Sequence, residues 1–343
     1  MINKNHQTFY QMGLLDFDDD IKPFKIDKPI RLIELFAGIG AQAKALENIG
    51  VEFEHYKICE FDPFAIRSYN AVHGTNFETS DITKIHAEDL EIEDADKYEY
   101  IMTYSFPCTD LSLAGKQKGM KKGSGTRSGL LWEVERLLKE LNQKGKNHLP
   151  KVLLLENVAQ LLSYKNRLDF DDWCHFLSSL GYENYYKILN AKDFGIPQDR
   201  ERCFMVSILG DGYYTFPKPK KLTICLKDIF EQEVDEKYVL SDKMIDGMKK
   251  TSFSQYKLEN KLKDINGIAD TILARFEGCP QCRLDSLGRL VRYTPKECWR
   301  LMGFSDEDFD KAKKAGLSDS KLYKQAGNSI VVNVLMAIFK QMI

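Results

Sequence analysis

The segment Arg31-Leu-Ile-Glu-Leu-Phe-Ala-Gly-Ile-Gly40 predicts a short buried strand that ends in a glycine-containing turn. A helical pattern follows from Ala41 to Ile49, so the turn connects a strand to a helix. Glycines in such a turn let the backbone approach a ligand closely. The segment therefore predicts the first unit of an α/β fold with a ligand at the turn.

Short apolar runs alternate with helical patterns along the next part of the chain. They predict strands at residues 56–59, 100–104 and 151–155, and the clearest helix at residues 130–141. Strands that alternate with helices indicate a parallel, doubly wound, Rossmann-like α/β sheet. After Arg202-Cys-Phe-Met-Val-Ser-Ile208 the periodicity becomes poor, so residues 211–290 predict a second, smaller domain. The apolar stretch at residues 331–343 predicts a final helix.

The bulk composition is that of an ordinary soluble protein. The 343 residues are 43% hydrophobic, and no apolar run approaches the roughly 20 residues that span a bilayer. The first 20 residues are polar and acidic, unlike a signal peptide. We therefore expect a cytoplasmic protein without membrane contact, in which the eight cysteines are free thiols. The single pair Cys279-x-x-Cys282 is interpreted as structural or incidental, and no metal is expected.

The net charge of −2 does not by itself indicate a nucleic-acid partner, because the distribution of charge matters more than its sum. Basic residues gather at residues 116–127, 218–227 and 249–263. Any one of these groups is ordinarily a solvated face. They become candidate phosphate contacts only if the chemistry of the chain requires a polyanion.

An acidic residue follows the second predicted strand at the distance expected for an adenosine site. Glu60 lies 20 residues beyond Gly40 and can accept hydrogen bonds from both ribose hydroxyls. Asp81 can accept a hydrogen bond from the adenine amino group, while Phe61 and Ile82 can pack on the faces of the ring. Both NAD and S-adenosylmethionine carry adenosine, so this pattern leaves the two cofactors open.

A candidate nucleophile follows the predicted strand at residues 100–104. Cys108 comes directly after Pro107, which stiffens the turn, and ligands of α/β sheets bind beyond the carboxyl ends of strands. A lone cysteine there is more often structural. However, residues 109–127 are basic and rich in glycine, which suits a lid that closes on a polyanionic substrate.

The chain resembles the bacterial DNA (cytosine-5) methyltransferase family through motifs that occur in the family's order along nearly its whole length. They are Phe36-Ala-Gly-Ile-Gly40, Phe106-Pro-Cys108, Glu156-Asn-Val158, Gln198-Asp-Arg200-Glu-Arg202, Arg292-Tyr-Thr-Pro-Lys-Glu-Cys-Trp-Arg-Leu-Met-Gly-Phe304 and Gln325-Ala-Gly-Asn328-Ser329-Ile-Val-Val-Asn333-Val. Two departures are Glu34, where the family often has Asp, and Thr109, where Gln is commoner. Neither removes a catalytic group.

The resemblance implies a reaction and a role for each motif. The thiolate of Cys108 adds to carbon 6 of a flipped cytosine, and a methyl group passes from S-adenosylmethionine to carbon 5, leaving S-adenosylhomocysteine. Protonated Glu156 donates to N3, Arg202 holds O2, and Arg200 orders the pocket or reaches a phosphate. The cofactor pocket implied by the resemblance and by the adenosine pattern contains Phe36, Gly38, Gly40, Glu60, Phe61, Asp81, Ile82, Pro107, Asn328 and Ser329.

The resemblance also implies how the chain is divided and what it binds. We expect a polar extension at residues 1–28, a catalytic domain at 29–210 plus 320–343, and a target-recognition domain at 211–319. Its substrate would be double-stranded DNA, and we expect a bacterial or phage-encoded enzyme in the cytoplasm that associates with the nucleoid through DNA. A monomer is expected, with a restriction endonuclease as a functional rather than a physical partner. Candidate DNA contacts are Ser112, Lys116, Lys118 and Arg127, with Arg275 and Arg283 as guanine readers.

Three alternative functions are weighed against this one. An NAD-dependent dehydrogenase fits the turn and Glu60 but gives Cys108, Glu156 and the two arginines no shared role. An RNA (tRNA) cytosine-5 methyltransferase would use the same scaffold, and the insert at residues 211–290 favours DNA without deciding the matter. A catalytically silent DNA-binding protein is disfavoured because Cys108 and Glu156 are both present.

Overall fold

The structure is a computed structural model that describes residues 22–111, 119–123, 125–275 and 280–343. Its centre is a six-stranded sheet with the strand order β2-β1-β3-β4-β7-β5. The strands of this sheet are β1 (Ile30–Leu35), β2 (Phe53–Cys59), β3 (Glu99–Tyr104), β4 (Val152–Val158), β5 (Tyr182–Asn190) and β7 (Glu201–Leu209). The strands predicted at residues 31–36, 56–59, 100–104 and 151–155 are therefore confirmed, with small shifts at their ends.

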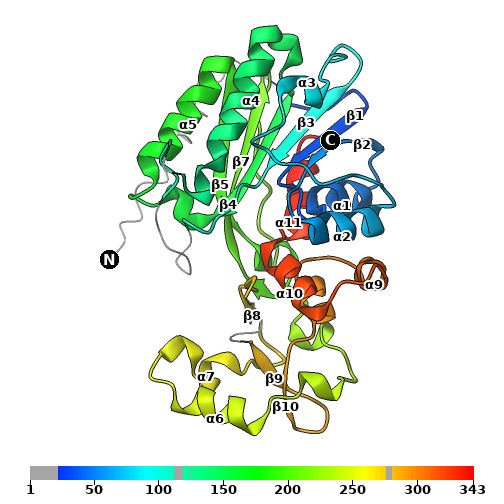
Figure 1. The fold of residues 1–343 in the computed structure, drawn as a ribbon, viewed down its shortest axis with the longest axis vertical. Helices are drawn as coiled ribbons and strands as arrows, with labels where there is room; N and C mark the ends of the chain where they lie inside the picture. The colour runs from blue at the N-terminus through cyan, green and yellow to red at the C-terminus, as the bar shows by residue number, and fades with distance from the viewer. Residues whose placement is uncertain (1–21, 112–118, 124, 276–279) are drawn as a thin grey trace.

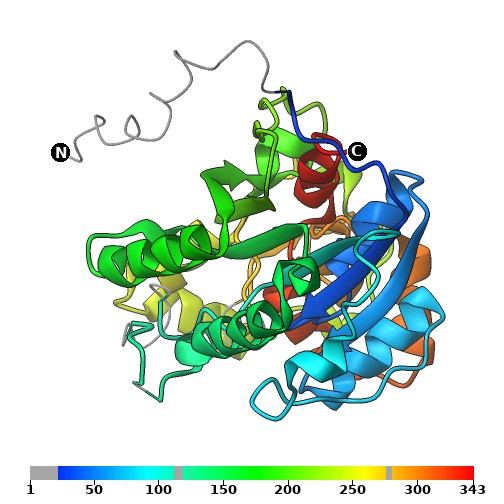
Figure 2. The same ribbon diagram turned by 90° about the horizontal axis from the view of Figure 1, so that it is seen from above.

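Helices cover both faces of the sheet, as a doubly wound fold requires (Figures 1 and 2). They are α1 (Ala41–Asn48), α2 (Pro63–His73), α3 (Ala87–Leu90), α4 (Leu131–Lys144), α5 (Arg167–Leu180) and α11 (Val332–Phe339). Helices α1 and α11 contact each other on one face, and α3 and α4 contact each other on the other. The final helix ends at Phe339, four residues before the predicted end at Ile343.

Alternate residues of each strand enter two separate hydrophobic clusters. On β4, Val152 and Leu154 pack with α1 and α11, while Leu153 and Leu155 pack with α4 and α5. The side-chain period of a strand is two, so a strand buried on both faces has to be apolar throughout. This double burial explains why the strands are short continuous apolar runs in the sequence.

The sheet is not wholly parallel, which corrects the prediction from the sequence. Strand β7 runs antiparallel to both of its neighbours, β4 and β5. A parallel connection needs a crossover of about a dozen or more residues, usually a helix. Residues 191–200 between β5 and β7 form only a short 3-10 turn and the two-residue strand β6 (Gln198–Asp199), so the chain reverses its direction there.

The segment before β1 is also bound more closely than a polar extension would be. The side chain of Phe24 is buried, its backbone N–H donates to the Tyr213 carbonyl at 2.9 Å, and the N–H of Ile26 donates to the Met342 carbonyl at 2.7 Å. Residues 22–28 therefore join the large domain, while residues 1–21 lie outside the described part of the chain.

A smaller unit lies beyond the carboxyl ends of the parallel strands, at the bottom of Figure 1. Its elements are α6 (Asp242–Lys250), α7 (Leu258–Lys261), β8 (Ala269–Asp270), β9 (Cys282–Leu284) and β10 (Leu290–Arg292). Strands β9 and β10 form an antiparallel hairpin, and β8 pairs with β6 of the large domain. Among the described helices, none is long and apolar enough to cross a membrane.

The chain returns to the large domain earlier than residue 320. Helices α8 (Pro295–Arg300), α9 (Asp306–Lys314) and α10 (Asp319–Asn328) follow the hairpin. Helix α9 contacts α2, the Asp308 carboxylate pairs with the Lys44 ammonium at 2.8 Å, and Phe309 belongs to the same hydrophobic cluster as β1. We therefore propose that the small domain ends near Arg292 rather than at residue 319.

Gly327 in α10 allows a very close contact between the two parts of the molecule. A Cβ atom at this position would lie 2.1 Å from the Ala274 nitrogen and 2.2 Å from the Leu273 carbonyl carbon. Because these are backbone atoms, they cannot swing aside. The end of α10 therefore requires a residue without a side chain where it meets residues 273–274.

We expect Gly327→Ala to lower the free energy of unfolding by about 1–3 kcal/mol, the usual cost of overpacking. Gly247→Ala in α6 is the matched control, since a Cβ there would meet nothing within 4 Å. Alanine is the better helix former, so this control should be neutral or stabilising. Urea unfolding followed by circular dichroism measures both, and equal effects of the two substitutions would contradict the close contact.

Candidate active site

The predicted cofactor turn follows β1 and has three residues with positive φ. They are Phe36 at 59°, Gly38 at 59° and Gly40 at 78°. At Gly40 a side chain is excluded sterically as well, because a Cβ would lie 2.3 Å from His73 Nε2 and 2.7 Å from Tyr69 Cε2. Phe36 is one of only two described non-glycine residues with positive φ, and such conformations concentrate at ligand sites.

Glu60 lies where the second strand ends, and it holds the turn. Its Oε2 accepts a hydrogen bond from the Gly38 N–H at 2.8 Å, and its Oε1 accepts one from the Asp62 N–H at 2.8 Å. Burial raises the pKa of this carboxyl, and these two backbone donors oppose the shift. A carboxylate oxygen has two lone-pair sites, so each oxygen can still accept a bond from a ligand.

The other predicted adenosine contacts gather beside Glu60. The Ser80 N–H donates to the Glu60 carbonyl at 2.9 Å, which brings the loop containing Asp81 next to the end of β2. Phe61 is 74% exposed, so its ring is accessible to a ligand. Ile82 instead is buried with α4 in the second cluster, so little of its side chain is left for a ring face.

Cys108 lies after β3 on a loop that is fixed from two sides. The Asn157 Nδ2 donates to the Phe106 carbonyl at 3.0 Å, and the Ser128 hydroxyl donates to the Pro107 carbonyl at 2.7 Å. Sequence reasoning gave neither donor a role, although Asn157 directly follows Glu156 in a quoted motif. The thiol of Cys108 is half-buried at the carboxyl edge of the sheet.

Glu156 and Arg202 share one face of the sheet, where β4 ends and β7 begins. Glu156 pairs with Phe204 and Val158 pairs with Arg202 across these strands, which makes Glu156 and Arg202 diagonal neighbours. Arg202 Nε lies 3.3 Å from Glu156 Oε1. Burial raises the pKa of Glu156, and the guanidiniums of Arg202 and Arg200 oppose that rise. The raised pKa that hydrogen-bond donation to N3 requires is therefore present.

Arg200 is a buried residue that binds three backbone carbonyls. Its Nη1 donates to Ile272 at 2.8 Å, and its Nη2 donates to Ser329 at 2.7 Å and to Gly327 at 3.1 Å. Burial, followed by the neighbouring Arg202 charge, lowers its pKa to about 9. Of the two expected roles, ordering the pocket therefore fits, whereas reaching a phosphate does not.

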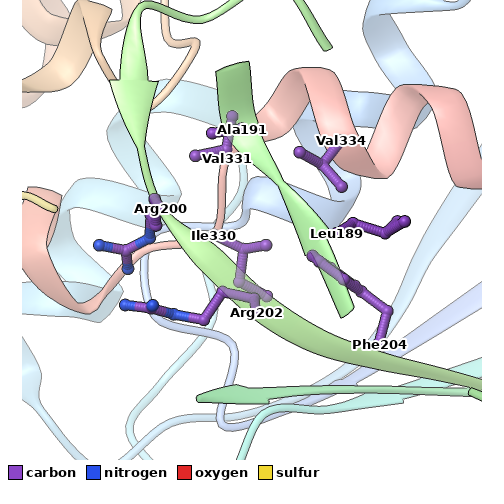
Figure 3. A pocket seen from close by; sticks show the side chains of 8 residues that line it. All are labelled: Leu189, Ala191, Arg200, Arg202, Phe204, Ile330, Val331 and Val334. Atoms are coloured by element: carbon purple, nitrogen blue, oxygen red, sulfur yellow. The ribbon is translucent and has the colours of Figure 1, made fainter. Parts of the chain in front are cut away.

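Arg200 directly precedes β7 and Arg202 is its second residue, and the two side chains project toward the same side (Figure 3). Both arginines also line a small hollow. The rest of its lining consists of Leu189, Ala191, Phe204, Ile330, Val331 and Val334 (Figure 3). These apolar neighbours contribute to the desolvation of the two guanidiniums.

Asp110, two residues after Cys108, is hydrogen-bonded to residues 119 and 127 further along the chain. This buried carboxylate accepts a hydrogen bond from the Arg127 N–H at 2.9 Å, and the Asp110 carbonyl accepts one from the Gly119 N–H at 3.0 Å. The side chain of Arg127 is exposed. The candidate DNA contacts Ser112, Lys116 and Lys118 fall outside the described residues.

The remaining predicted residues divide between exposed and buried positions. Asn328 is exposed at the end of α10, whereas Ser329 is buried and offers its carbonyl to Arg200. Arg275 is exposed, as a DNA contact must be. The prediction for Arg283 is wrong, because its Nη2 pairs with Glu297 Oε1 at 2.6 Å and only 4% of the residue is exposed. Cys282 is a buried thiol, and Cys279 lies outside the described residues.

Cys108 is close enough to the charged groups for each to affect its acidity. Burial raises the pKa of its thiol, and the Glu156 charge raises it further, while Arg202 and Arg200 lower it. The four groups predicted as catalytic come from the loop after β3, from β4, and from residues 200–202 at and just before the start of β7. A thiolate formed here lies between an acid and two guanidiniums.

We expect the pH midpoint for alkylation of Cys108 by iodoacetamide to lie above that of free cysteine. Because a raised pKa keeps the thiol protonated, reactivity should appear only as the pH rises through the shifted value. Glu156→Gln removes a negative charge and should move the midpoint down, whereas Arg202→Met should move it up. Peptide mass mapping isolates the rate at Cys108, and midpoints that do not differ among the three proteins would contradict this coupling.

Comparison with known proteins agrees with the motifs and the fold. Residues 30–343 match the family described as C-5 cytosine-specific DNA methylase. The type II methyltransferase M2.ScrFI of Lactococcus lactis subsp. cremoris is 33% identical, over 91% of this chain and 99% of the relative. The type II methyltransferase M.HhaI of Haemophilus parahaemolyticus is 31% identical, over 90% of this chain and 93% of the relative.

Further relatives extend the comparison to an orphan enzyme and to solved structures. The orphan methyltransferase M.SssI of Spiroplasma monobiae is 32% identical, over 91% of this chain and 96% of the relative. The crystal structure of S. pombe Dnmt2 methyltransferase has a TM-score of 0.70 at 20% identity, over 90% of this chain and 97% of that one. The predicted fold class and family are thereby confirmed. The chain belongs to the C-5 cytosine-specific DNA methylase family and is a DNA (cytosine-5) methyltransferase.

Proposed function

We propose that the chain methylates carbon 5 of a flipped cytosine in a specific duplex sequence through a covalent adduct on Cys108. The observation that carries this proposal is geometric: Arg202 Nε lies 3.3 Å from Glu156 Oε1, and Asn157, which follows Glu156, donates to the Phe106 carbonyl on the loop that holds Cys108. These contacts support a site in which residues distant in sequence are neighbours in space. A thiol, a protonated carboxyl and a guanidinium are the groups that addition to a cytosine ring needs.

Each group has a separate task in the reaction. The Cys108 thiolate forms a bond to carbon 6, and the electron pair displaced from the ring makes carbon 5 nucleophilic. Glu156, whose pKa is raised by burial, donates its proton toward N3. Arg202 offers its guanidinium to O2. After carbon 5 has been methylated, a base takes its proton, the C5–C6 double bond re-forms, and the sulfur leaves as thiolate.

The residues around the first turn fit S-adenosylmethionine. Glycine at positions 38 and 40 exposes the backbone, the carboxylate of Glu60 keeps free acceptor sites, and Phe61 exposes a ring for stacking. When it is bound, this cofactor supplies the electrophilic methyl group. Pro107, Asn328 and Ser329 are proposed to complete its pocket, which keeps the methyl donor near Cys108.

The target atoms are inaccessible in a duplex, so the cytosine has to leave the base stack. Extrusion costs a few kcal/mol, which phosphate contacts can offset. The exposed Arg127 and Arg275 are proposed to contact DNA. The small domain, with its lysines at residues 249–263, is proposed to read the sequence, and Ser112, Lys116 and Lys118 are proposed for the loop beside the flipped base.

The biological setting is proposed from the relatives. The relatives M2.ScrFI and M.HhaI are named type II methyltransferases, which supports a functional pairing with a restriction endonuclease. The relative M.SssI is named an orphan methyltransferase, which supports the alternative of an enzyme without such a partner. We propose a monomeric cytoplasmic enzyme that reaches the nucleoid through DNA. Bisulfite sequencing of DNA from cells that express the chain gives the modified base and its sequence context together. Methylation of tRNA with none of duplex DNA would favour an RNA substrate.

We expect Cys108→Ser to abolish methyl transfer while S-adenosylmethionine still binds. A hydroxyl is far less ionised than a thiol near neutral pH and adds poorly to the ring. Transfer of tritiated methyl to DNA measures turnover, and calorimetry measures cofactor binding. Cys225→Ser is the matched control, because this cysteine is half-buried like Cys108 but lies outside the three strands that carry the proposed site. A Cys108→Ser enzyme with the wild-type rate would refute the assigned nucleophile.

We also expect a stable covalent complex with DNA that contains 5-fluorocytosine at the target position. Fluorine at carbon 5 cannot leave as a cation, so elimination of the Cys108 sulfur is blocked after methylation. A denaturing gel with labelled DNA detects the adduct, and mass spectrometry locates it. No adduct should form with Cys108→Ser, and an adduct at another cysteine would contradict the mechanism.

A further inference from the structure

Behind the cofactor turn lies a buried group of polar side chains that the reaction does not use. His73 ends α2, and its side chain is completely buried. Its Nε2 lies 3.2 Å from the Ile39 carbonyl oxygen, and its Nδ1 lies 2.6 Å from Glu47 Oε1. Both ring nitrogens therefore lie within hydrogen-bond distance of oxygen acceptors, one on the turn and one on α1.

The His73 ring contacts the turn through the Ile39 carbonyl. It belongs to the peptide that leads into Gly40, whose φ of 78° sets the direction of the following helix. The Gly40 N–H of the same peptide donates to the Ala37 carbonyl at 3.0 Å. His73 and Ala37 therefore hold the two ends of this peptide, while Glu60 holds the Gly38 N–H from the other side.

Glu47 keeps the His73 ring in place. Besides His73, it accepts a hydrogen bond from the Lys44 ammonium at 2.6 Å. Burial acts to raise the pKa of Glu47, but the bonds from His73 and Lys44 outweigh burial and lower it to about 2. The carboxylate is therefore charged, and the pair is charge-assisted, which makes it stronger than a neutral hydrogen bond.

The neighbouring histidine is held in the neutral form. Burial, followed by the His73 charge, lowers the pKa of His55 to about 4. His55 Nδ1 lies 2.8 Å from the Tyr69 hydroxyl, which itself donates to the buried Glu34 Oε2 at 2.5 Å. The rings of His55 and Tyr69 also pack against the His73 ring, with centroids 5.3 and 4.5 Å away, and so restrict its rotation.

A metal ion is the competing explanation for this cluster. Among the described residues, the ligand atoms of Glu47, His55 and His73 lie within 4.8 Å of one another. Two ligands of one tetrahedral zinc ion would be about 3.3 Å apart, given zinc–nitrogen bonds of about 2 Å. The Glu47–His73 separation of 2.6 Å is instead that of a hydrogen bond, so a proton joins them.

We propose that His73 is a positioning residue for S-adenosylmethionine, and that it acts by fixing the Ile39–Gly40 peptide from behind. This inference rests on the proposed function of the turn. The contact exists before the substrate binds and does not touch the reacting atoms. Its loss should therefore weaken cofactor binding and leave the chemical step at saturating cofactor nearly unchanged.

The test compares two substitutions at this position by steady-state kinetics and by calorimetric cofactor binding. His73→Leu removes both ring nitrogens, whereas the amide nitrogen of His73→Gln can still reach the Ile39 carbonyl. We expect His73→Leu to raise KM and Kd for S-adenosylmethionine about tenfold, the size typical of losing a hydrogen bond. Its kcat should stay within about twofold, and His73→Gln should recover most of the affinity.

A matched control separates positioning from general stability. His148 also donates to a backbone carbonyl, that of Ile92 at 2.6 Å, but lies far from the turn in the chain. His148→Leu should lower the melting temperature without changing KM. If His73→Leu does not fold, Glu47→Gln keeps an acceptor for Nδ1 but removes its charge, and it should raise KM by a smaller factor.

Three results would overturn the inference. The first is an unchanged KM in His73→Leu, and the second is an equal loss of affinity in His73→Leu and His73→Gln. The third is stoichiometric zinc in the purified protein that is lost on chelation together with cofactor affinity. A wild-type enzyme that binds no S-adenosylmethionine would instead refute the proposed function, so the two failures are distinguishable.

Discussion

The buried guanidinium of Arg200 joins three parts of the chain that are far apart in sequence. Its nitrogens donate to carbonyls of Ile272, Gly327 and Ser329, which belong to the return from the small domain and to the end of α10. A charge in a dry environment is costly unless hydrogen bonds compensate it, and these three bonds compensate the two Nη groups, while the buried Nε has no hydrogen-bond partner among the described residues. The start of β7, the small domain and the last helices therefore have to meet at this residue, beside Cys108.

The same dry environment creates a conflict that the site has to resolve. Burial raises the pKa of Glu156, which suits an acid that donates its proton to N3. It also raises the pKa of Cys108, which opposes formation of the thiolate. The two guanidiniums counteract the second effect, and Arg202 lies 3.3 Å from the Glu156 carboxyl. An acid and a nucleophile with opposite needs can thus share one pocket.

The proposed cofactor turn is held by two side chains from different elements. Glu60, at the end of β2, binds the Gly38 N–H, and the buried His73 side chain, at the end of α2, binds the Ile39 carbonyl. Gly40 lies between them with no space for a Cβ. A turn clamped in this way can present its backbone to a ligand without rearranging, which reduces the entropy lost on binding.

Much of the fold and of the site could be predicted because the responsible features are local. A strand buried on both faces has to be an apolar run, and a tight turn has to contain glycine, so residues 31–40 determine their own structure. Cys108 and Glu156 follow strand ends, and parallel strand ends meet at one edge of the sheet. Their roles came from the family resemblance, and the structure brings them together with Arg202.

Other features depend on partners that no local pattern specifies. The direction of β7 follows from the short connection at residues 191–200. Helix α9 belongs to the large domain because it packs on α2. Arg283 is buried because Glu297 lies opposite it, although both residues are of types that usually face solvent. The sequence by itself determined the strands, the turn and the order of the motifs. Only the tertiary structure decided which charges are buried and paired, because that depends on contacts between residues distant in the chain.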